Sequence, residues 1–226
     1  MSDDNGMDVS GGGEKTAARI ESVCDELELS DSVVNNATEL FYQRYKHADG
    51  FRGKNLDVVA SAVIYAAAKI EHIGVPVTTV SEQLSVDESR VFNELKQLEN
   101  TVDIPIPVET PQMFISHIVT RLNEADECFE DDIEATETVA KELAEDITSR
   151  DYSNGMSASG VAAGAVYTIG KFAPWVESTP TQRQVARAAD VAVVTVRDQY
   201  HGITNEIEIG DYFPESVLRD DHSDGD

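Results

Sequence analysis

The chain contains only two cysteines among its 226 residues, and this scarcity excludes several kinds of site. Cys24 and Cys128 belong to no CxxC pair, and no histidine follows them at metal-ligand spacing, so the sequence predicts no zinc site. Two isolated cysteines are more typical of reduced core residues than of a disulfide. We therefore expect a protein without a metal or any other cofactor.

The sequence also lacks the residue clusters that catalysis requires. Its five histidines are scattered, which disfavours a nucleophile–base pair. No glycine-rich loop follows a strand or precedes a Lys-Ser or Lys-Thr pair, so no phosphate-binding loop is expected. The acidic run at 127–132 lacks the spacing of a calcium loop and is more typical of a solvated helix start. These absences predict that the protein is not an enzyme.

Long apolar runs and targeting signals are missing as well. No run of ~18 apolar residues occurs, so we expect no transmembrane helix and no membrane partner. Residues 1–15 are acidic and rich in glycine, unlike a signal peptide. Together with the cysteine usage, this predicts a cytoplasmic protein.

Basic residues are scarce: 17 Lys and Arg stand against 43 Asp and Glu, and only seven of the basic residues are lysines. The resulting net charge of −26 indicates either an acidic partner-binding region or a whole surface adapted to a salt-rich cytoplasm. The acidic residues are spread along most of the chain, which favours the second explanation. At molar salt the Debye length falls to ~3 Å, so this charge would repel DNA much less than in dilute buffer.

Strand signals are nearly absent and helical periodicity runs through most of the chain, which predicts an all-α fold. After a disordered lead at 1–13, helices are expected at 14–28, 32–47, 54–70, near 79–84 and at 87–99, with a loop at 49–53. We expect Asp87 to cap the last helix, and Thr79 with Glu82 to form a capping box for the short one. The third helix carries a buried stripe made of Leu56, Val59, Ala60, Val63, Ile64 and Ala67.

The sequence repeats itself after a stiff, proline-rich link at 104–107. Residues 59–65, VASAVIY, recur at 161–167 as VAAGAVY, an offset of 102 residues, and three valines farther along recur at an offset of 105. This internal duplication predicts two tandem five-helix domains, at 14–103 and 104–203, followed by an acidic tail at 204–226. Two unrelated helical bundles are the alternative, which the ordered correspondences disfavour.

Residues 181–200, TQRQVARAADVAVVTVRDQY, have the pattern of two short helices joined by a tight turn at 189–191, as in a helix-turn-helix. Thr181 and Gln184 have the spacing of a capping box. The side of the second helix expected to face the core carries Val193, Val196, Tyr200 and Ile203. The side expected to face solvent carries Val194, Arg197, Asp198 and His201. An ordinary solvated helix also fits this pattern, because a single exposed valine is normal.

These blocks resemble the tandem cyclin-like core of archaeal transcription factor B and its eukaryotic relative TFIIB. The resemblance rests on FRGKNLDVVASAVIYAAAKIEHIGVPVTTVSEQLSVDESRVFNEL in the first repeat, and on GMSASGVAAGAVYTIGKF and TPTQRQVARAADVAVVTVRDQY in the second. TQRQVA and VAVVTVRDQY are the most specific blocks, and the likeness covers about residues 14–203. It implies two cyclin-like domains, each ending in a helix-turn-helix-like pair. It also implies a role in transcription initiation, with promoter DNA and TATA-box-binding protein as partners.

The family's second-repeat recognition helix reads a promoter element just upstream of the TATA box, and the residues matching its readers are Val194 and Arg197. An arginine can donate two hydrogen bonds to a guanine, and a valine can pack on a thymine methyl group. The resemblance also implies supporting roles for Thr195 and Tyr200. Contacts with the DNA backbone, or support of the helix-turn-helix, are expected from Arg183, Arg187 and Lys171.

The charge of the second repeat favours the same assignment. Residues 150–203 carry five basic and four acidic residues, a net of +1 that leaves −27 on the rest of the chain. A segment spared from an acidified surface is expected to face something anionic. Deeper burial of this segment would be the alternative explanation.

The chain also departs from the family pattern. No cysteine-rich zinc ribbon precedes the first repeat, which leaves contact with RNA polymerase open. In the second repeat, Met156 and Ala158 stand where the family has a basic residue and a proline. In the first repeat, acidic residues and a serine replace the basic ones at 87–89, and residues 72–99 carry five acidic and two basic residues. The acidic character of 72–99 disfavours DNA contact by the first repeat.

The leading hypothesis is a factor B-like core of a halophilic archaeon that binds promoter DNA, or its complex with TATA-box-binding protein, through the second repeat. Without a ribbon, such a core would compete with a full-length factor or regulate a subset of promoters. A cyclin-like protein-interaction scaffold without DNA binding and an incomplete factor B gene are the alternatives.

Overall fold

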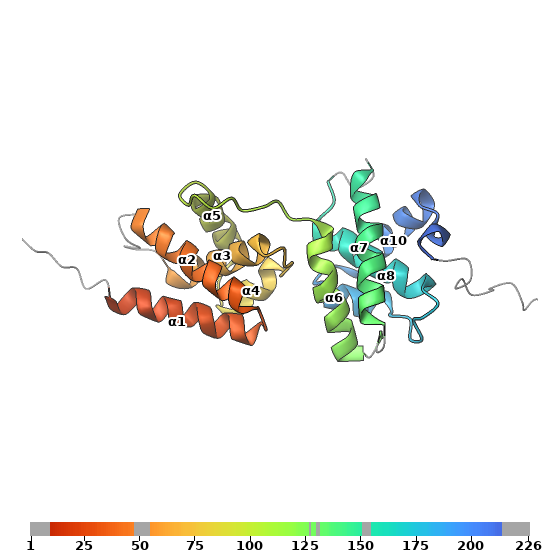
Figure 1. Cartoon of the computed structure of the whole chain (residues 1–226), viewed down its shortest axis with the longest axis horizontal. Coiled ribbons are helices and arrows are strands. Elements are labelled where there is room, and N and C mark those ends of the chain that lie inside the picture. The colour runs from red at the N-terminus through yellow and green to blue at the C-terminus, as the bar shows by residue number, and fades with distance from the viewer. Residues whose placement is uncertain (1–9, 48–54, 127, 130–131, 151–154, 214–226) are drawn as a thin grey trace, which may run out of the picture. The chain divides into compact units, whose positions relative to one another are not determined.

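A computed structural model of the chain describes residues 10–47, 55–126, 128–129, 132–150 and 155–213. Across these residues the chain forms ten α-helices and a short 3-10 helix and contains no strand, so the all-α prediction is confirmed. The chain divides into two compact units, residues 1–108 and residues 109–226 (Figure 1). Each unit has its own apolar core. The predicted loop at 49–53 and most of the predicted lead and tail lie outside the described residues.

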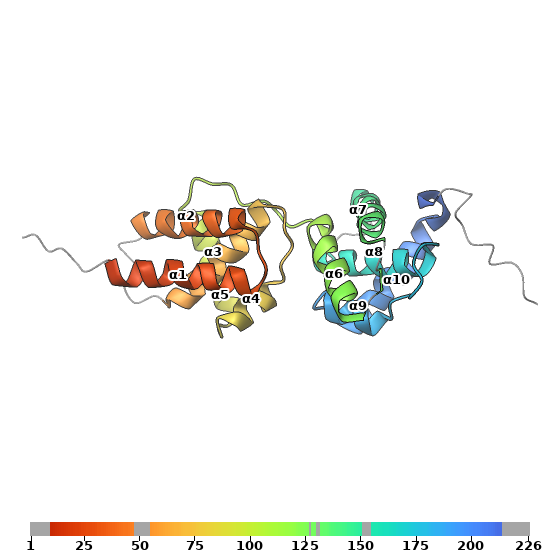
Figure 2. The ribbon, with the colours of Figure 1, turned by 60° about the horizontal axis from the view of Figure 1, so that its bottom comes forward.

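Unit 1 is built around one buried helix. It consists of α1 (Ser10–Glu26), α2 (Asp31–His47), α3 (Leu56–Ile70), α4 (Val77–Gln83) and α5 (Glu88–Glu99). Helix α3 contacts the other four helices, and α1 and α2 lie side by side (Figure 2). Every residue from Val58 to Ala68 is buried, so the predicted apolar stripe is too narrow. The alanines of α3 let helices approach it on several sides at once.

Unit 2 has the same arrangement around a second buried helix. It consists of α6 (Pro111–Asp126), α7 (Ile133–Ser149), α8 (Ala158–Phe172), α9 (Gln182–Ala188) and α10 (Val193–Glu206), followed by the 3-10 helix η2 (Ile209–Tyr212). Helix α8 contacts the other four α-helices of the unit, and α6 and α7 lie side by side (Figure 1). Every residue from Gly160 to Gly170 is buried, so α8 is the counterpart of α3.

The helix boundaries repeat with the offsets found in the sequence. Helices α7 and α8 begin and end 102 residues after α2 and α3, and α9 begins and ends 105 residues after α4. Helices α4 and α9 also end alike, since Ser85 and Asp190 take positive φ angles of 51° and 52°. In both places the next residue, a valine, donates its backbone N–H to the carbonyl five residues earlier. The duplication therefore extends to the backbone conformation of the turns.

Two helix starts differ from the prediction. Helix α1 begins at Ser10, inside the stretch expected to be disordered. Helix α4 begins at Val77, directly after Pro76, so the predicted capping box of Thr79 and Glu82 is wrong and both residues lie inside the helix. Proline has a fixed φ and no N–H group, and it can therefore occupy the position before a helix without losing a hydrogen bond.

The predicted acidic tail begins inside unit 2. Helix α10 continues to Glu206, and Ile207, Ile209 and Phe213 are buried in the core of the unit. The ring of Phe213 meets Trp175 edge-on, with 5.5 Å between ring centroids. Apolar side chains spaced among the acidic residues thus hold the described part of this segment against the unit.

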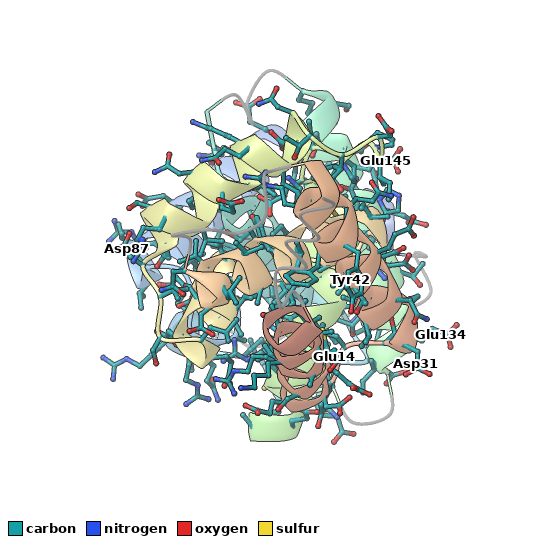
Figure 3. All side chains as sticks on the ribbon, turned by 90° about the vertical axis from the view of Figure 1, so that its left-hand side faces the viewer. Glu14, Asp31, Tyr42, Asp87, Glu134 and Glu145 are labelled. Atoms are coloured by element: carbon teal, nitrogen blue, oxygen red, sulfur yellow. The ribbon has the colours of Figure 1, made fainter. Side chains whose placement is uncertain are left out.

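Both cysteine thiols are buried, whereas two carboxylates at the starts of α1 and α2 are exposed. Glu14 and Asp31, which are labelled in Figure 3, are exposed. Cys24 and Cys128 are buried and free, as expected. Burial, together with the charge of Asp25, raises the pKa of Cys24 to about 11, so this thiol stays protonated at neutral pH.

Candidate nucleic-acid interface

Helices α9 and α10 form two short helices with a tight turn, as the pattern of residues 181–200 predicts. The capping box is confirmed: Thr181 Oγ1 accepts the N–H of Gln184 at 3.3 Å, and Gln184 Oε1 accepts the N–H of Thr181 at 2.7 Å. Asp190 makes the turn with a left-handed backbone. Arg121 on α6 donates from Nη1 to the carbonyl of Ala188 at 3.1 Å. The pair is therefore held at its start, at its turn and from the neighbouring helix.

Helix α10 packs closely on α8 because two glycines of α8 face it. A Cβ atom added at Gly164 would lie 2.4 Å from the Cβ of Gln199, and one added at Gly160 would lie 3.0 Å from Cγ2 of Thr195. Two carbon atoms normally approach to about 3.5–4.0 Å. A larger residue at Gly164 would therefore push α10 away from α8, and the glycines set the position of α10 on the unit.

Five exposed residues in the first three turns of α10 form what we call its outer face: Val193, Val194, Arg197, Asp198 and His201. Val194 is 48% exposed, as predicted, whereas Val193 is 44% exposed and does not face the core as predicted. Val193 is the first residue of α10, and the close packing on α8 at Thr195 lies two residues farther on. The first turn of α10 therefore presents two neighbouring valines to solvent.

Arg197 is exposed, and its guanidinium contacts the carboxylate of the next residue. Its Nε and Nη2 groups donate to Asp198 Oδ1 at 3.1 and 3.0 Å. The two side chains are 53% and 62% exposed, so this ion pair adds little to stability. Arg197 thus remains accessible to a ligand while it is paired.

The N-terminus of α10 has no side-chain cap. Ala192 occupies the N-cap position, and its methyl side chain cannot accept a hydrogen bond from the first backbone N–H groups. These N–H groups and the helix dipole give this end a partial positive charge. Arg197 lies in the next turn, so backbone N–H donors and a guanidinium are available at the same end of the helix. Val194, in the first turn, adds an apolar contact surface beside them.

Thr195 and Tyr200 fix α10 rather than extend its outer face. Both are half-buried, Thr195 beside Gly160 and Tyr200 with its ring edge-on to Tyr167 at 5.2 Å between centroids. Gln199, which the sequence analysis did not single out, is buried against Gly164 of α8, and its Nε2 donates to the sulfur of Met156 at 3.0 Å.

The predicted basic residues do not all lie on one surface. Arg183 and Arg187 are exposed one turn apart on α9, so they share a face of that helix. Lys171 is also exposed but lies in the last turn of α8, roughly 16 Å along that helix from Gly160, which packs against α10. Lys171 is therefore separate from the first turns of α10.

The corresponding helix of unit 1 carries different chemistry on the same backbone. Asp87 caps α5 by accepting the N–H of Ser89 at 3.0 Å, where α10 has an alanine. Phe92, 41% exposed, stands at the position of Arg197 and packs edge-on to the ring of Tyr65. Glu94 is buried, and its carboxylate accepts from an α2 arginine, so only four of the five acidic residues counted at 72–99 face solvent.

Neither a metal site nor a membrane span is found in the described part of the chain. No group of three or more His, Cys, Asp or Glu side chains there is arranged to hold a metal ion. The acidic run at 127–132 lies partly outside the described residues. No described helix combines the length and apolar character that crossing a bilayer requires.

Comparisons with known proteins give matches in both halves of the chain. The family model described as "Transcription factor TFIIB repeat" matches residues 12–101, which lie in unit 1. "Transcription initiation factor IIB 3" of Halobacterium salinarum is 26% identical over 170 residues, covering 74% of this chain and 49% of that protein. "Transcription initiation factor IIB" of Saccharolobus shibatae is 25% identical over 190 residues, covering 84% and 58%. The protein of the same name from Pyrodictium occultum is 24% identical over 196 residues, covering 87% and 59%.

The chain thus spans about half to three fifths of the length of these archaeal relatives. Among solved structures, a chain in the "CAK complex form Chaetomium thermophilum bound to ATP-gamma-S" aligns with a TM-score of 0.38 and 11% identity, covering 91% of this chain and 66% of that one. A likeness at that level carries no argument about fold or function.

Proposed function

Because the chain belongs to the TFIIB family, we propose that it acts in transcription initiation by binding promoter DNA, or the complex of promoter DNA with TATA-box-binding protein, through unit 2. The outer face of α10 enters the major groove, where Arg197 donates to a guanine and Val194 packs on a thymine methyl group. The TFIIB family consists of transcription factors, and the chain is accordingly not an enzyme.

The observation that carries this proposal is the joint exposure of Val194 and Arg197 at the uncapped start of a helix with a fixed position. A groove-reading helix must hold its side chains at a fixed position relative to the rest of the domain, because a misplaced donor loses its hydrogen bond to a base edge. The glycine contacts of α8 and the hydrogen bond from Arg121 supply that fixed position.

The charge distribution supports the same assignment. The segment 150–203 has a net charge of +1 in a chain of net charge −26. Arg183 and Arg187 share an exposed face of α9, the helix before the turn, where arginines suit contacts with phosphate. The strongly acidic remainder fits a protein that works in a salt-rich cytoplasm, where short screening lengths weaken its repulsion of DNA.

A gel-shift assay at molar potassium chloride tests the proposal, with a duplex that contains a TATA element and purified archaeal TATA-box-binding protein. We expect a complex with the wild-type chain and a weaker, less sequence-selective complex with Arg197→Ala. Loss of a two-bond guanine contact costs ~1–3 kcal/mol of base discrimination. Arg90→Ala is the matched control, because it removes one exposed arginine from the corresponding helix of unit 1. Identical binding by Arg197→Ala and wild type at every concentration would contradict the proposal.

A second candidate function is a protein-interaction scaffold without DNA binding, and one observation favours it. Phe92 is 41% exposed on α5, in an otherwise polar helix surface. Exposed aromatic side chains are common anchors in protein interfaces. A complex with a protein partner at a fixed ratio that is unaffected by added DNA and lost in Phe92→Ala would favour this function over the first.

A further inference from the structure

We propose that Asp198 is a specificity-determining residue, which holds the guanidinium of Arg197 in the orientation that reads a guanine. This inference rests on the proposed function of α10 and names a second residue of the same site. A residue of this kind acts through Arg197 and is a positioning residue rather than a base contact.

The geometry of the pair leaves the reading edge of Arg197 available. A guanidinium offers two forks of N–H groups: one formed by Nε and a terminal nitrogen, and one formed by the two terminal nitrogens. Asp198 Oδ1 accepts from Nε and Nη2, at 3.1 and 3.0 Å, and therefore occupies the first fork. The end-on fork can still donate to the N7 and O6 atoms of a guanine in the major groove.

Such an arrangement orients the guanidinium of Arg197 before DNA binds. Arginine has a long, flexible side chain, and binding must immobilise it if no other group does so beforehand. Asp198 lies one residue farther along the same helix, and its carboxylate moves with the backbone that carries Arg197. The two hydrogen bonds hold the plane of the guanidinium before DNA arrives, so a correctly placed guanine gains more than a wrong base does.

The same carboxylate has an opposite effect on affinity. Its negative charge lies on the outer face of α10 and repels every DNA sequence alike, through the phosphates. Asp198 is thus expected to weaken overall binding while it raises discrimination between bases. These two effects have opposite signs, and this separates positioning from simple charge repulsion.

The test compares Asp198→Asn with wild type, Arg197→Ala and Glu206→Gln. Asparagine keeps the shape of aspartate but removes the charge-assisted acceptor. Glu206→Gln removes one exposed negative charge at the other end of α10 and is the matched charge control. The probes are duplexes with a TATA element and an upstream segment selected by the wild-type chain in the presence of TATA-box-binding protein at molar potassium chloride. Single guanines of the selected segment are then replaced by 7-deazaguanine, which lacks the N7 acceptor, or by adenine.

The measured quantity is the ratio of dissociation constants for the substituted and the guanine duplex. We expect Arg197→Ala to bring this ratio close to one and Asp198→Asn to lower it by roughly two- to fivefold, the range that an exposed ion pair worth up to ~1 kcal/mol can supply. Affinity of Asp198→Asn for unrelated duplexes should stay equal or rise. Glu206→Gln should leave the ratio unchanged. Fluorescence melting of Trp175, the single tryptophan, checks that unit 2 remains folded in each variant.

The outcomes separate the inference from the proposed function. If Asp198→Asn binds all duplexes more tightly with the wild-type ratio, Asp198 is only a repelling charge and the inference is wrong, although the proposed function stands. If wild type binds none of the duplexes, or if Arg197→Ala keeps the wild-type ratio, the proposed function is wrong and the inference is wrong with it.

Discussion

Replacing Gly164 with alanine is expected to displace α10 from α8. The added Cβ would meet the Cβ of Gln199 at 2.4 Å and Cδ1 of Ile203 at 3.1 Å. Because carbon atoms require about 3.5 Å, the two helices must separate by ~1 Å at this point. The contact atom of Gln199 is a Cβ fixed to the backbone, so rotation of a side chain cannot relieve the clash.

The cost follows from two opposing contributions. Overpacking a tight contact costs ~1–3 kcal/mol, and a contact between two Cβ atoms belongs at the upper end of that range. Alanine in place of glycine favours a helix by about 1 kcal/mol, which offsets part of the cost. We therefore expect Gly164→Ala to destabilise unit 2 by about 2 kcal/mol, or to lower its Tm by roughly 8 °C.

Trp175 makes this measurement specific to unit 2. It is the only tryptophan of the chain and packs against Phe213 in the core of that unit, so its fluorescence reports the unfolding of unit 2 alone. Gly210→Ala is the matched control, since an added Cβ there meets no atom within 4 Å. A Gly164→Ala variant as stable as wild type, or more stable, would refute the claim that the glycines set the position of α10.

Two further predictions concern buried ionisable side chains. Glu94→Ala leaves Arg44 buried without its carboxylate partner at 2.9 Å, and unit 1 should lose ~3–5 kcal/mol, measured as an earlier far-UV circular dichroism transition in urea. Exposed Glu99→Ala on the same helix should leave that transition in place, and equal effects of the two would contradict the role of burial. Burial, and secondarily the charge of Arg121, lowers the pKa of His117 to about 4. The folded state therefore favours the neutral imidazole. The stability that unit 2 gains from this neutral His117 is fully present above about pH 6.5 and is lost as the pH falls through 4. The Tm of unit 2 should fall less steeply with acid in His117→Leu than in wild type, and parallel curves would be the contrary result.

The repeated helices could be predicted because their signals are periodic and local. Asp87 and the box of Thr181 and Gln184 cap their helices as the sequence indicates, since these contacts span two or three residues. The capping box expected at Thr79 fails because Pro76 starts the helix earlier. A local pattern is thus reliable where no stronger neighbouring signal competes with it.

The candidate site was harder to predict, because its position depends on contacts between distant segments. Gly160 and Gly164, two small residues four apart in a buried helix, are a sequence signal of close helix packing. The helix that packs on them, α10, can be identified only from the structure. The hydrogen bond from Arg121 to Ala188 joins residues 67 positions apart and has no sequence signature. Helix periodicity also placed Val193 inside, whereas the start of the helix leaves it exposed.

The central claim, that the outer face of α10 contacts promoter DNA, is tested most directly by site-specific photo-crosslinking. A photoreactive amino acid is placed at Val194 or at Ser89, which are exposed and occupy corresponding positions of α10 and α5. In the presence of TATA-box-binding protein and a promoter duplex at molar salt, we predict crosslinks from position 194 to bases next to the TATA element and none from position 89. No crosslink from position 194, or equal crosslinks from both positions, would contradict the assignment of α10 as the DNA-contacting helix.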